Sequence, residues 1–370
     1  GFIGGALFHR LVSYGLPVVA TVLYPHERDL LRQNGHSAHL LDLTDDTPWD
    51  PILEGIDIVF HIAAMFQEVE CASEEYDKAN HHGALKLAQT AERAGVKRFV
   101  HCSTVGVLGD VMEIPATEET PFNPMDIYHR TKLDGELAIL HWAESLPDGA
   151  MTVVVNRPAM VYGPGDLRML KLFKAILSRR FLMIGSGETL AHLCHIEDQV
   201  ESFLLCAVAP IEKVHLQAFN IASGSPLTLN QLAEIISTVG GVPLRKWKLP
   251  VAPVWLAGFI CEMVCKPLGI KPPIFRRRVG FFQSAEVAGL SFGLGCGRGH
   301  SIDDSVVSRK RADPVNRVSK QNRQARKESR GCNGKTRTIG KAVDPDGGTS
   351  AVFSGTRLAD RGSADAGDPL

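Results

Sequence analysis

Short apolar runs alternate with longer amphipathic stretches through the first part of the chain, and the two kinds of segment differ in period. The apolar runs are rich in β-branched residues and are expected to be strands. They cover residues 18–23, 38–41, 56–61, 98–103 and 151–156. The expected helices between them cover residues 6–14, 27–33, 75–94 and 128–145. This alternation predicts βαβ units and a parallel, doubly wound sheet of the α/β class.

One of these runs indicates where the sheet lies in the molecule. Residues 56–64 read IDIVFHIAA, which is an almost continuous apolar run rather than an alternation. A strand of this kind is buried on both faces, and such burial requires helices on both sides of the sheet. The sheet is therefore expected to be the central layer of a first domain formed by residues 1–158.

The regular alternation loosens after Pro158. Residues 170–178 are expected to be helical, and Thr228 with Gln231 predicts a capping box at the start of a further helix. Residues 159–284 are interpreted as a smaller substrate-binding region that is interleaved with the sheet.

The character of the chain changes again in residues 285–370. Residues 308–337 are rich in Arg, Lys, Gly and Ser and have neither helical nor strand periodicity. We expect an irregular tail here, made of non-native or disordered sequence, and we find no internal repeat in the chain.

Composition narrows the class of protein. The 370 residues carry a net charge of -1 and are 44% hydrophobic, which is ample for a buried core and gives no global field to attract nucleic acid. The eight cysteines form no CxxC pair and no zinc-spaced cluster with histidine, so free thiols, a cytoplasmic location and no metal are expected. The longest apolar run, residues 251–265, is shorter than the roughly 20 residues that a membrane span needs.

The opening residues GFIGG have the spacing of a phosphate-binding turn. Gly1 and Gly4 fit the last two glycines of a GxxGxxG loop, with a helix from Ala6 onward whose N-terminus faces the phosphates. On this interpretation the first strand and the first glycine are missing from the chain. Small residues also begin many ordinary helices, so this pattern is weak evidence when it stands alone.

Tyr128 and Lys132 lie four residues apart, on one face of an expected helix. A fixed ammonium favours phenolate, so Lys132 is expected to lower the pKa of Tyr128 and make it a general base. The alternative is an ordinary tyrosine and lysine on a surface helix. The strand of residues 98–103 favours the catalytic interpretation, because it brings the hydroxyls of Ser103 and Thr104 to the carboxyl edge of the sheet, where ligands of such sheets bind.

Several motifs follow one another in an order that is similar to the extended short-chain dehydrogenase/reductase family. They are GFIGG, LDLTD, VFHIAA, NHHG, HCSTVGVLG, YHRTK, NRPAMVYGPGD, HIED and AFNIASGSPLTLNQL, and they span residues 1 to about 284. The family includes nucleotide-sugar epimerases and dehydratases and the 3β-hydroxysteroid dehydrogenase branch. The resemblance implies a Rossmann-like fold whose first strand is missing here.

The resemblance also implies roles for individual residues. Tyr128 corresponds to the catalytic acid or base, Lys132 to the residue that modulates it and binds the nicotinamide ribose, and Thr104 to the hydroxyl that orients the substrate, with Ser103 as its fallback. The remaining implied cofactor-binding positions are Gly1, Phe2, Ile3, Gly4, Asp42, Leu43, Ile62, Ala63, Ala64, Asn80 and Pro158. Simpler roles remain open, since Asp42 can cap a turn and Ala63 can merely pack closely.

The implied activity is hydride transfer between NAD or NADP and a secondary alcohol or ketone. The coenzyme is left open because Val22, Leu23 and Tyr24 replace the acidic or basic residue that usually decides it. The substrate is expected to be a sugar nucleotide, a steroid-like molecule or another secondary alcohol. Arg168 is the candidate for an anionic substrate group, whereas His195 is expected to be structural.

Other interpretations are kept beside this one. A nucleotide-sugar epimerase or dehydratase uses the same residues, and a dinucleotide-sensing protein without catalysis belongs to a different class. A chain that lacks its first strand is also expected to risk inactivity. Pairing of long helices favours a homodimer, and residues 249–278 are an apolar segment with a basic end, which allows peripheral contact with a membrane.

Overall fold

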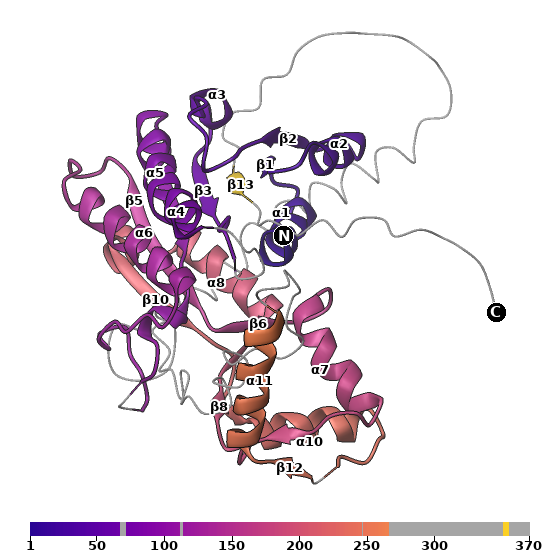
Figure 1. The fold of residues 1–370 in the computed structure, drawn as a ribbon. Helices are drawn as coiled ribbons and strands as arrows, with labels where there is room; N and C mark the ends of the chain where they lie inside the picture. The colour runs from indigo at the N-terminus through magenta and orange to yellow at the C-terminus, as the bar shows by residue number, and fades with distance from the viewer. Residues whose placement is uncertain (67–71, 112–113, 246, 266–350, 355–370) are drawn as a thin grey trace, which may run out of the picture.

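The computed structural model describes residues 1–66, 72–111, 114–245, 247–265 and 351–354. Within these residues a parallel sheet forms the centre of the molecule (Figure 1), with the strand order β10, β5, β4, β3, β13, β1, β2. Its strands are β1 (Val18–Val22), β2 (Ser37–Leu40), β3 (Ile58–His61), β4 (Arg98–Cys102), β5 (Thr152–Pro158), β10 (Gln217–Ile221) and β13 (Ala351–Ser354). The predicted doubly wound α/β sheet is confirmed.

Helices cover both faces of the sheet. One face carries α1 (Phe2–Ser13) and α8 (Ile196–Val208), and the other carries α4 (Ser73–Asp77), the π-helix η1 (Lys78–His82), α5 (Gly83–Arg93) and α6 (Ile127–Glu144). The short elements α2 (Pro25–Gln33), α3 (Asp50–Leu53) and the 3-10 turn η2 (Val105–Leu108) lie between strands and helices.

Neighbouring residues of the central strands point into two different cores. Phe60 and Val100 pack with Leu7 of α1 and Phe203 of α8. The adjacent residue Phe99 packs with helices α5 and α6 on the opposite side. This division explains why the strands read as continuous apolar runs, because each successive side chain is buried against one layer of helices or the other.

The strand β13 lies at the position that was expected to be missing. It pairs in parallel with β1 on one side, where Val18 is opposite Ala351, and with β3 on the other, where Ile58 is opposite Ala351. The expectation of an irregular tail therefore does not hold for Ala351–Ser354. Residues 266–350 and 355–370, and with them the basic end of the apolar segment, lie outside the described residues.

The rest of the chain forms a smaller lobe below the sheet in Figure 1, except that α9 and β10 return to the sheet. The elements of this lobe are β6 (Met160–Tyr162), α7 (Leu167–Leu177), β7 (Met183–Ile184), β8 (Leu190–Ala191), β9 (Leu193–His195), β11 (Leu227–Thr228), α10 (Leu229–Val239), β12 (Lys248–Leu249) and α11 (Val251–Cys265), whereas α9 (Ile211–Val214) packs against β5 and β10 of the sheet. Ile176 of α7 and Leu232 and Ile236 of α10 form the core of this lobe. The predicted capping box between Thr228 and Gln231 is confirmed at the start of α10.

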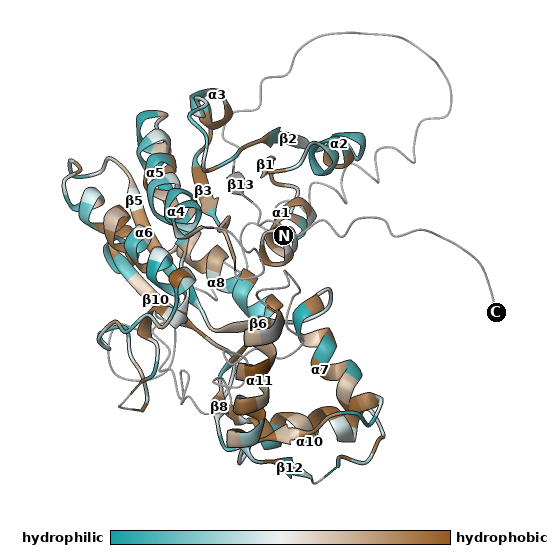
Figure 2. Cartoon of the chain, in the orientation of Figure 1, coloured by the Kyte–Doolittle hydropathy of each residue, from teal (hydrophilic) through white to brown (hydrophobic). Residues whose placement is uncertain are grey.

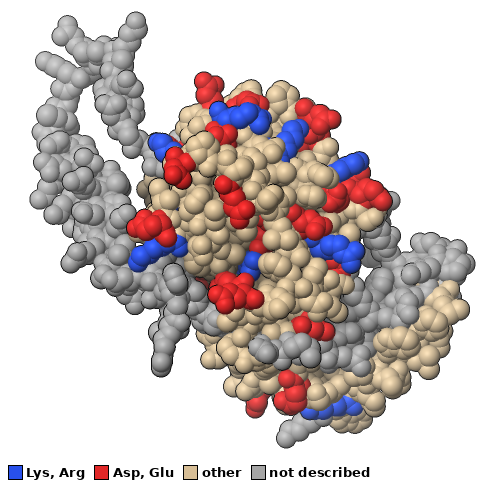
Figure 3. Space-filling model, turned by 90° about the vertical axis from the view of Figure 1, so that its left-hand side faces the viewer, with Lys and Arg blue, Asp and Glu red and all other residues tan. Residues whose placement is uncertain are grey.

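Surface character differs between the two lobes. Acidic and basic side chains are interspersed on the side of the molecule that carries α5 and α6 (Figure 3), so neither sign dominates that face. Helix α11 is apolar along most of its length (Figure 2), and Trp255, Leu256, Ile260 and Met263 are exposed on it. Among the helices that the structure describes, none has both the length and the apolar character needed to cross a membrane.

Candidate active site

Helix α6 brings Tyr128 and Lys132 to the carboxyl edge of the sheet. The helix begins after Asp126, whose Oδ1 accepts a hydrogen bond from the backbone nitrogen of His129 at 2.8 Å. Such a cap fixes the first turn, which carries Tyr128. The Tyr128 ring meets the Phe66 ring edge to face, with the two centroids 4.9 Å apart. Lys132 lies one turn further along and is only 1% exposed.

The Lys132 ammonium is buried without a hydrogen-bond partner at Nζ. Its charge lowers the pKa values of His101 and Cys102, which lie on β4, and of His61, which lies on the adjacent strand β3. Burial lowers the pKa of Lys132, while Cys102 and Glu136 oppose that change. A buried ammonium that donates no hydrogen bond is costly, and its N–H groups remain available to a ligand with acceptor oxygens.

The pKa of Tyr128 differs from the expectation based on the sequence. Burial of the phenol raises its pKa far above the ordinary value, Cys102 raises it further, and Arg168 acts in the opposite direction. Lys132 is not among the groups that shift it, so the expected lowering by Lys132 is wrong for the structure described here. Burial of the phenol outweighs the opposing charge of Arg168, and Tyr128 therefore keeps its proton at neutral pH.

The hydroxyls at the end of β4 lie beside this helix. Thr104 is the N-cap of η2, and its Oγ1 accepts a hydrogen bond from the Gly106 nitrogen at 3.2 Å. Because a hydroxyl can accept and donate at once, Thr104 keeps one proton that it can donate to a ligand. The Ser103 hydroxyl is buried and has no hydrogen-bond partner. The contact between η2 and α6 thus brings Ser103 and Thr104 into the same region as Tyr128 and Lys132.

Asn80 connects the helices to the strand that precedes the site. Its amide oxygen accepts from the Met65 nitrogen at 2.7 Å, and its amide nitrogen donates to Met65 O at 3.0 Å and to Thr131 Oγ1 at 3.1 Å. A Cβ atom added at Gly135 would lie 2.1 Å from the backbone oxygen of Asn80. Helices α6 and η1 therefore approach each other so closely that only glycine fits at this position. Asn80 therefore supports the site indirectly, because its side chain holds the Met65 backbone and helix α6 in place.

The remaining implied cofactor positions lie at or near the same edge of the sheet. Helix α1 begins directly after Gly1 and has no side-chain cap, which leaves the backbone N–H groups of Phe2, Ile3 and Gly4 to a ligand. Ile62, Ala63 and Ala64 follow β3, and Pro158 ends β5. The uncapped start of α1 and the unpartnered ammonium of Lys132 both fit the phosphates and ribose of a dinucleotide.

Two of these positions also have simpler roles. The Asp42 carboxylate accepts from the nitrogen and the hydroxyl of Thr44, at 2.9 Å and 2.7 Å, and so closes a turn. Leu43 is buried, and its backbone oxygen would lie 2.4 Å from a Cβ added at Gly83. Asp42 therefore fixes the turn after β2, and Leu43 holds that turn against the start of α5.

The smaller lobe contributes a cation close to the tyrosine. The Arg168 guanidinium lies 5.8 Å from the centre of the Phe66 ring, donates to Asp166 Oδ1 and to Val161 O, and is about half exposed. His195 has a different role, because its Nδ1 caps α8 by accepting from the Glu197 nitrogen at 3.3 Å. This geometry fits the structural role expected for His195.

A buried ion pair under the site was not singled out in the sequence. Arg157 of β5 donates to Glu136 of α6 through Nε at 3.0 Å and again through Nη2, and neither side chain reaches solvent. The pair fixes the helix of Tyr128 and Lys132 to the sheet. An arginine at the end of the otherwise apolar run MTVVVNRP was the available signal, because a charge in a buried strand requires a partner.

Comparisons with known proteins agree with this geometry. Residues 1–222 match the sequence model of the NAD dependent epimerase/dehydratase family. A 4-hydroxy-2-methyl-3-oxo-4-farnesyl-3,4-dihydroquinoline-1-oxide ketoreductase of Stigmatella aurantiaca is 26% identical and covers 72% of this chain and 79% of its own length. A 3 beta-hydroxysteroid dehydrogenase/Delta 5-->4-isomerase of Mycobacterium tuberculosis is 29% identical over 56% of this chain and 58% of its own.

A solved structure supports the same relationship. MoeE5 in complex with UDP-glucose and NAD has a TM-score of 0.56 and 27% identity, and the match covers 68% of this chain and 82% of MoeE5.

Proposed function

The chain belongs to the NAD-dependent epimerase/dehydratase family and is an NAD(P)-dependent enzyme of the extended short-chain dehydrogenase/reductase type; we propose that Thr104, Tyr128 and Lys132 form its reaction centre. The enzyme transfers hydride between the nicotinamide cofactor and a secondary alcohol or ketone. One observation carries the assignment of residues. A buried ammonium without a partner lies on the same helix as a partly buried phenol, beside the hydroxyls that end β4.

The residues divide the work as follows. The cofactor supplies the hydride donor or acceptor. During ketone reduction the Tyr128 hydroxyl donates its proton to the substrate oxygen, and during alcohol oxidation Tyr128 first loses its proton to solvent and its phenolate oxygen then receives the proton of the alcohol. The raised pKa of Tyr128 suits the first direction, because the phenol is protonated before the reaction begins. Thr104 orients the substrate oxygen with its remaining hydroxyl proton, and Lys132 donates hydrogen bonds to cofactor hydroxyls.

The substrate is a small molecule, and we propose that it carries an anionic group close to Arg168. The half-exposed guanidinium is held over Phe66, whose ring also contacts Tyr128, so an anion bound there would place the rest of the substrate against the phenol. The UDP-glucose bound by MoeE5 has such a group in its diphosphate. This observation favours a nucleotide-sugar epimerase as the second candidate.

Replacement of Tyr128 by phenylalanine tests the reaction centre. We expect Tyr128→Phe to bind NAD or NADP within about twofold of the parent protein and to lose at least about 100-fold in turnover, since general acid–base groups contribute that much. The control is Tyr14→Phe at the exposed end of α1, which should leave turnover unchanged. Undiminished turnover in Tyr128→Phe would remove Tyr128 from the mechanism.

Cofactor retention separates the two candidate reactions. An epimerase regenerates its cofactor within each cycle, so the purified protein should release stoichiometric NAD when it is denatured. A dehydrogenase exchanges its cofactor at each turnover, so it should be purified empty and bind added NAD or NADP reversibly. Chromatography of the denatured supernatant gives the answer and identifies the coenzyme.

We also propose that two copies associate through the face formed by α5 and α6, which pack side by side. Leu137 of α6 is exposed on the outside of the molecule and offers an apolar contact. Sedimentation equilibrium should give twice the chain mass, and Leu137→Glu should shift the protein toward the single chain.

A further inference from the structure

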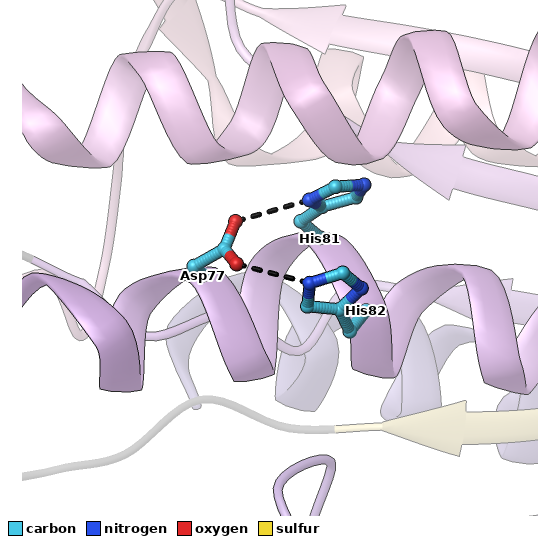
Figure 4. A group of neighbouring side chains, drawn as sticks. All are labelled: Asp77, His81 and His82. Carbon is cyan, nitrogen blue, oxygen red and sulfur yellow. Dashed lines mark hydrogen bonds and ion pairs between the residues drawn. The ribbon is translucent and has the colours of Figure 1, made fainter.

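Three side chains away from the reaction centre form a compact group of metal-binding type. Asp77 ends α4, and His81 and His82 end the π-helix η1 (Figure 4). Asp77 Oδ1 lies 3.0 Å from His81 Nδ1, and Asp77 Oδ2 lies 3.1 Å from His82 Nε2. All three ligand atoms lie within 4.8 Å of one another, and the imidazole rings stack with centroids 4.2 Å apart.

The π-helix is what brings His82 into the group. In an α-helix the residue five positions after Asp77 would be rotated away by roughly 140°. In η1 the Gly83 nitrogen bonds to Lys78 O, which is the i to i+5 pattern of a π-helix. This wider turn places the residues four and five positions after Asp77 on the same side, so one carboxylate faces two imidazoles. Inserted turns of this kind occur frequently at functional sites.

We propose that Asp77, His81 and His82 bind one divalent transition-metal ion, with zinc as the best-matched ion. Two neutral imidazoles and a carboxylate are ligands that zinc accepts at about 2.0–2.2 Å, and a tetrahedral ion leaves its fourth position to water. The separation of 3.0 Å between Asp77 Oδ1 and His81 Nδ1 is already close to the roughly 3.4 Å that this geometry requires, and the ligand atoms of the three residues all lie within 4.8 Å of one another. The expectation of no metal was based on cysteine and histidine spacing in the sequence, which did not include this turn.

The surroundings leave the site open to solvent. The side chains of Asp77, His81 and His82 are 40%, 26% and 64% exposed. Asp77 and His82 line a surface groove of about 460 Å³ between the α4–η1 segment and α6. Glu74 and Asp134 also line this groove, and their negative charges balance the positive charges of Lys78 and Arg130. An ion can therefore enter without any displacement of the backbone and without a strongly repulsive cationic field.

The site also lies next to the residue that supports the reaction centre. Asn80 is in the same π-helix and is fixed to Met65 and Thr131 by its side chain. A metal ion bound across Asp77, His81 and His82 would hold this turn closed. Metal binding should therefore stabilise the folded protein, and the effect does not depend on which substrate the enzyme uses.

Titration of the full-length, chelator-treated and reduced protein with zinc, in competition with a chromophoric chelator, tests the proposal. The parent should bind one equivalent at this site. His81→Ala and His82→Ala should each weaken binding by at least about tenfold, as loss of a ligand requires. The matched control is His141→Ala, because His141 forms a similar exposed pair with Glu144 at 3.5 Å outside the group and its removal should change nothing.

Cobalt(II) distinguishes this site from thiol binding. Cys261 and Cys265 lie one turn apart with their sulfur atoms 3.9 Å from each other and are the main competing ligands among the described residues. The cobalt complex at Asp77, His81 and His82 should lack thiolate charge-transfer absorption and persist in the double variant Cys261→Ser, Cys265→Ser. Wild-type affinity in the two histidine variants, or loss of binding in the cysteine variant, would overturn the proposal.

A folding control keeps the result interpretable. Asp77→Asn retains the shape of the side chain, so in the presence of chelator the variant should unfold at the same temperature as the parent. When zinc is added, the unfolding temperature of the parent should rise and that of the variant should not. A zinc-induced rise that survives in Asp77→Asn counts against the site.

Discussion

Lys132 is the residue whose surroundings are least compatible with stability alone. Its ammonium lies in the interior beside Cys102, His61 and His101 and donates no hydrogen bond. A lysine in such a place destabilises the folded protein unless a ligand accepts hydrogen bonds from its ammonium group. The cofactor-binding role proposed for Lys132 would account for a lysine at a position where it does not favour folding.

Lys132→Met should separate these two effects. Methionine keeps much of the length and removes the buried charge, so we expect the protein without cofactor to gain about 1–3 kcal/mol in unfolding free energy. Affinity for NAD or NADP should fall at least tenfold in the same variant. Urea unfolding and cofactor titration measure the two quantities, with Lys174→Met at the end of α7 as a surface control. A variant that is both less stable and normal in cofactor affinity would contradict this account.

The buried histidines of β3 and β4 should make stability depend on pH. Burial, with Lys132 nearby, lowers the pKa of His61 to about 3 and that of His101 well below its ordinary value. Between pH 3 and about 6.5 these histidines are therefore protonated in the unfolded chain and neutral in the folded chain. The free energy of unfolding is highest above this range and decreases as the pH falls through it.

His101→Gln removes one of these titrating groups. The slope of unfolding free energy against pH between pH 5 and 6 should fall by up to about 1.4 kcal/mol per pH unit. Urea titrations at several pH values measure the slope, and His141→Gln on the exposed part of α6 should leave it unchanged. An unaltered slope in His101→Gln would mean that His101 titrates normally.

At the scale of elements, the periods of the sequence predicted most of what is observed. The runs at residues 98–103 and 151–156 became β4 and β5, and the helix expected at residues 128–145 became α6. The expected helix at residues 75–94 instead contains the π-helix η1. A period of 3.6 residues cannot reveal an inserted residue, so the meeting of Asp77 and His82 was not predictable.

The ordered motifs led to the candidate site, but two of its properties arise only in three dimensions. The pKa of Tyr128 is raised because residues far apart in the sequence pack around its phenol. The partner of Arg157 is Glu136, and no local spacing connects a strand residue with one on the preceding helix. Sequence patterns identify residue types and order, whereas burial and pairing depend on packing.

Gly135→Ala should disturb the contact between α6 and η1. The new Cβ would lie 2.1 Å from the backbone oxygen of Asn80, which cannot move away as a side chain does. We expect a loss of about 3 kcal/mol or more in unfolding free energy. Gly5→Ala is the matched control, because Gly5 is also helical and has nothing within 4 Å of the added atom; it should gain about 0.5–1 kcal/mol. Equal effects of the two variants would show that the close approach is unimportant.

At the scale of the whole molecule, the sheet depends on β13 for its continuity. This strand is the direct link between β1 and β3, and β2 pairs with the sheet through β1. The two halves of the sheet are otherwise joined by helices and loops. Weak pairing at β13 would therefore free β1 and β2 together and leave β3, β4, β5 and β10 intact.

Val352→Pro should reveal this dependence. Proline lacks the N–H that a central strand donates, and it breaks a ladder in the middle of a sheet. We expect amide hydrogen exchange in β1 and β3 to rise at least tenfold, with little change in β5. Val352→Thr keeps the N–H and the branched side chain and should preserve the protection. Unchanged exchange in the proline variant would exclude β13 as the link.

The place of β13 in the chain has a consequence for how the protein is made. Its neighbours β1 and β3 are synthesised before it, and Ala351–Ser354 follows every other described strand of the sheet along the chain. Loop closure over such a separation costs only slightly more free energy than over a shorter one, but pairing of distant strands slows folding. During synthesis the edges of β1 and β3 therefore stay unpaired until Ala351–Ser354 has left the ribosome, and unpaired strand edges of this kind favour aggregation.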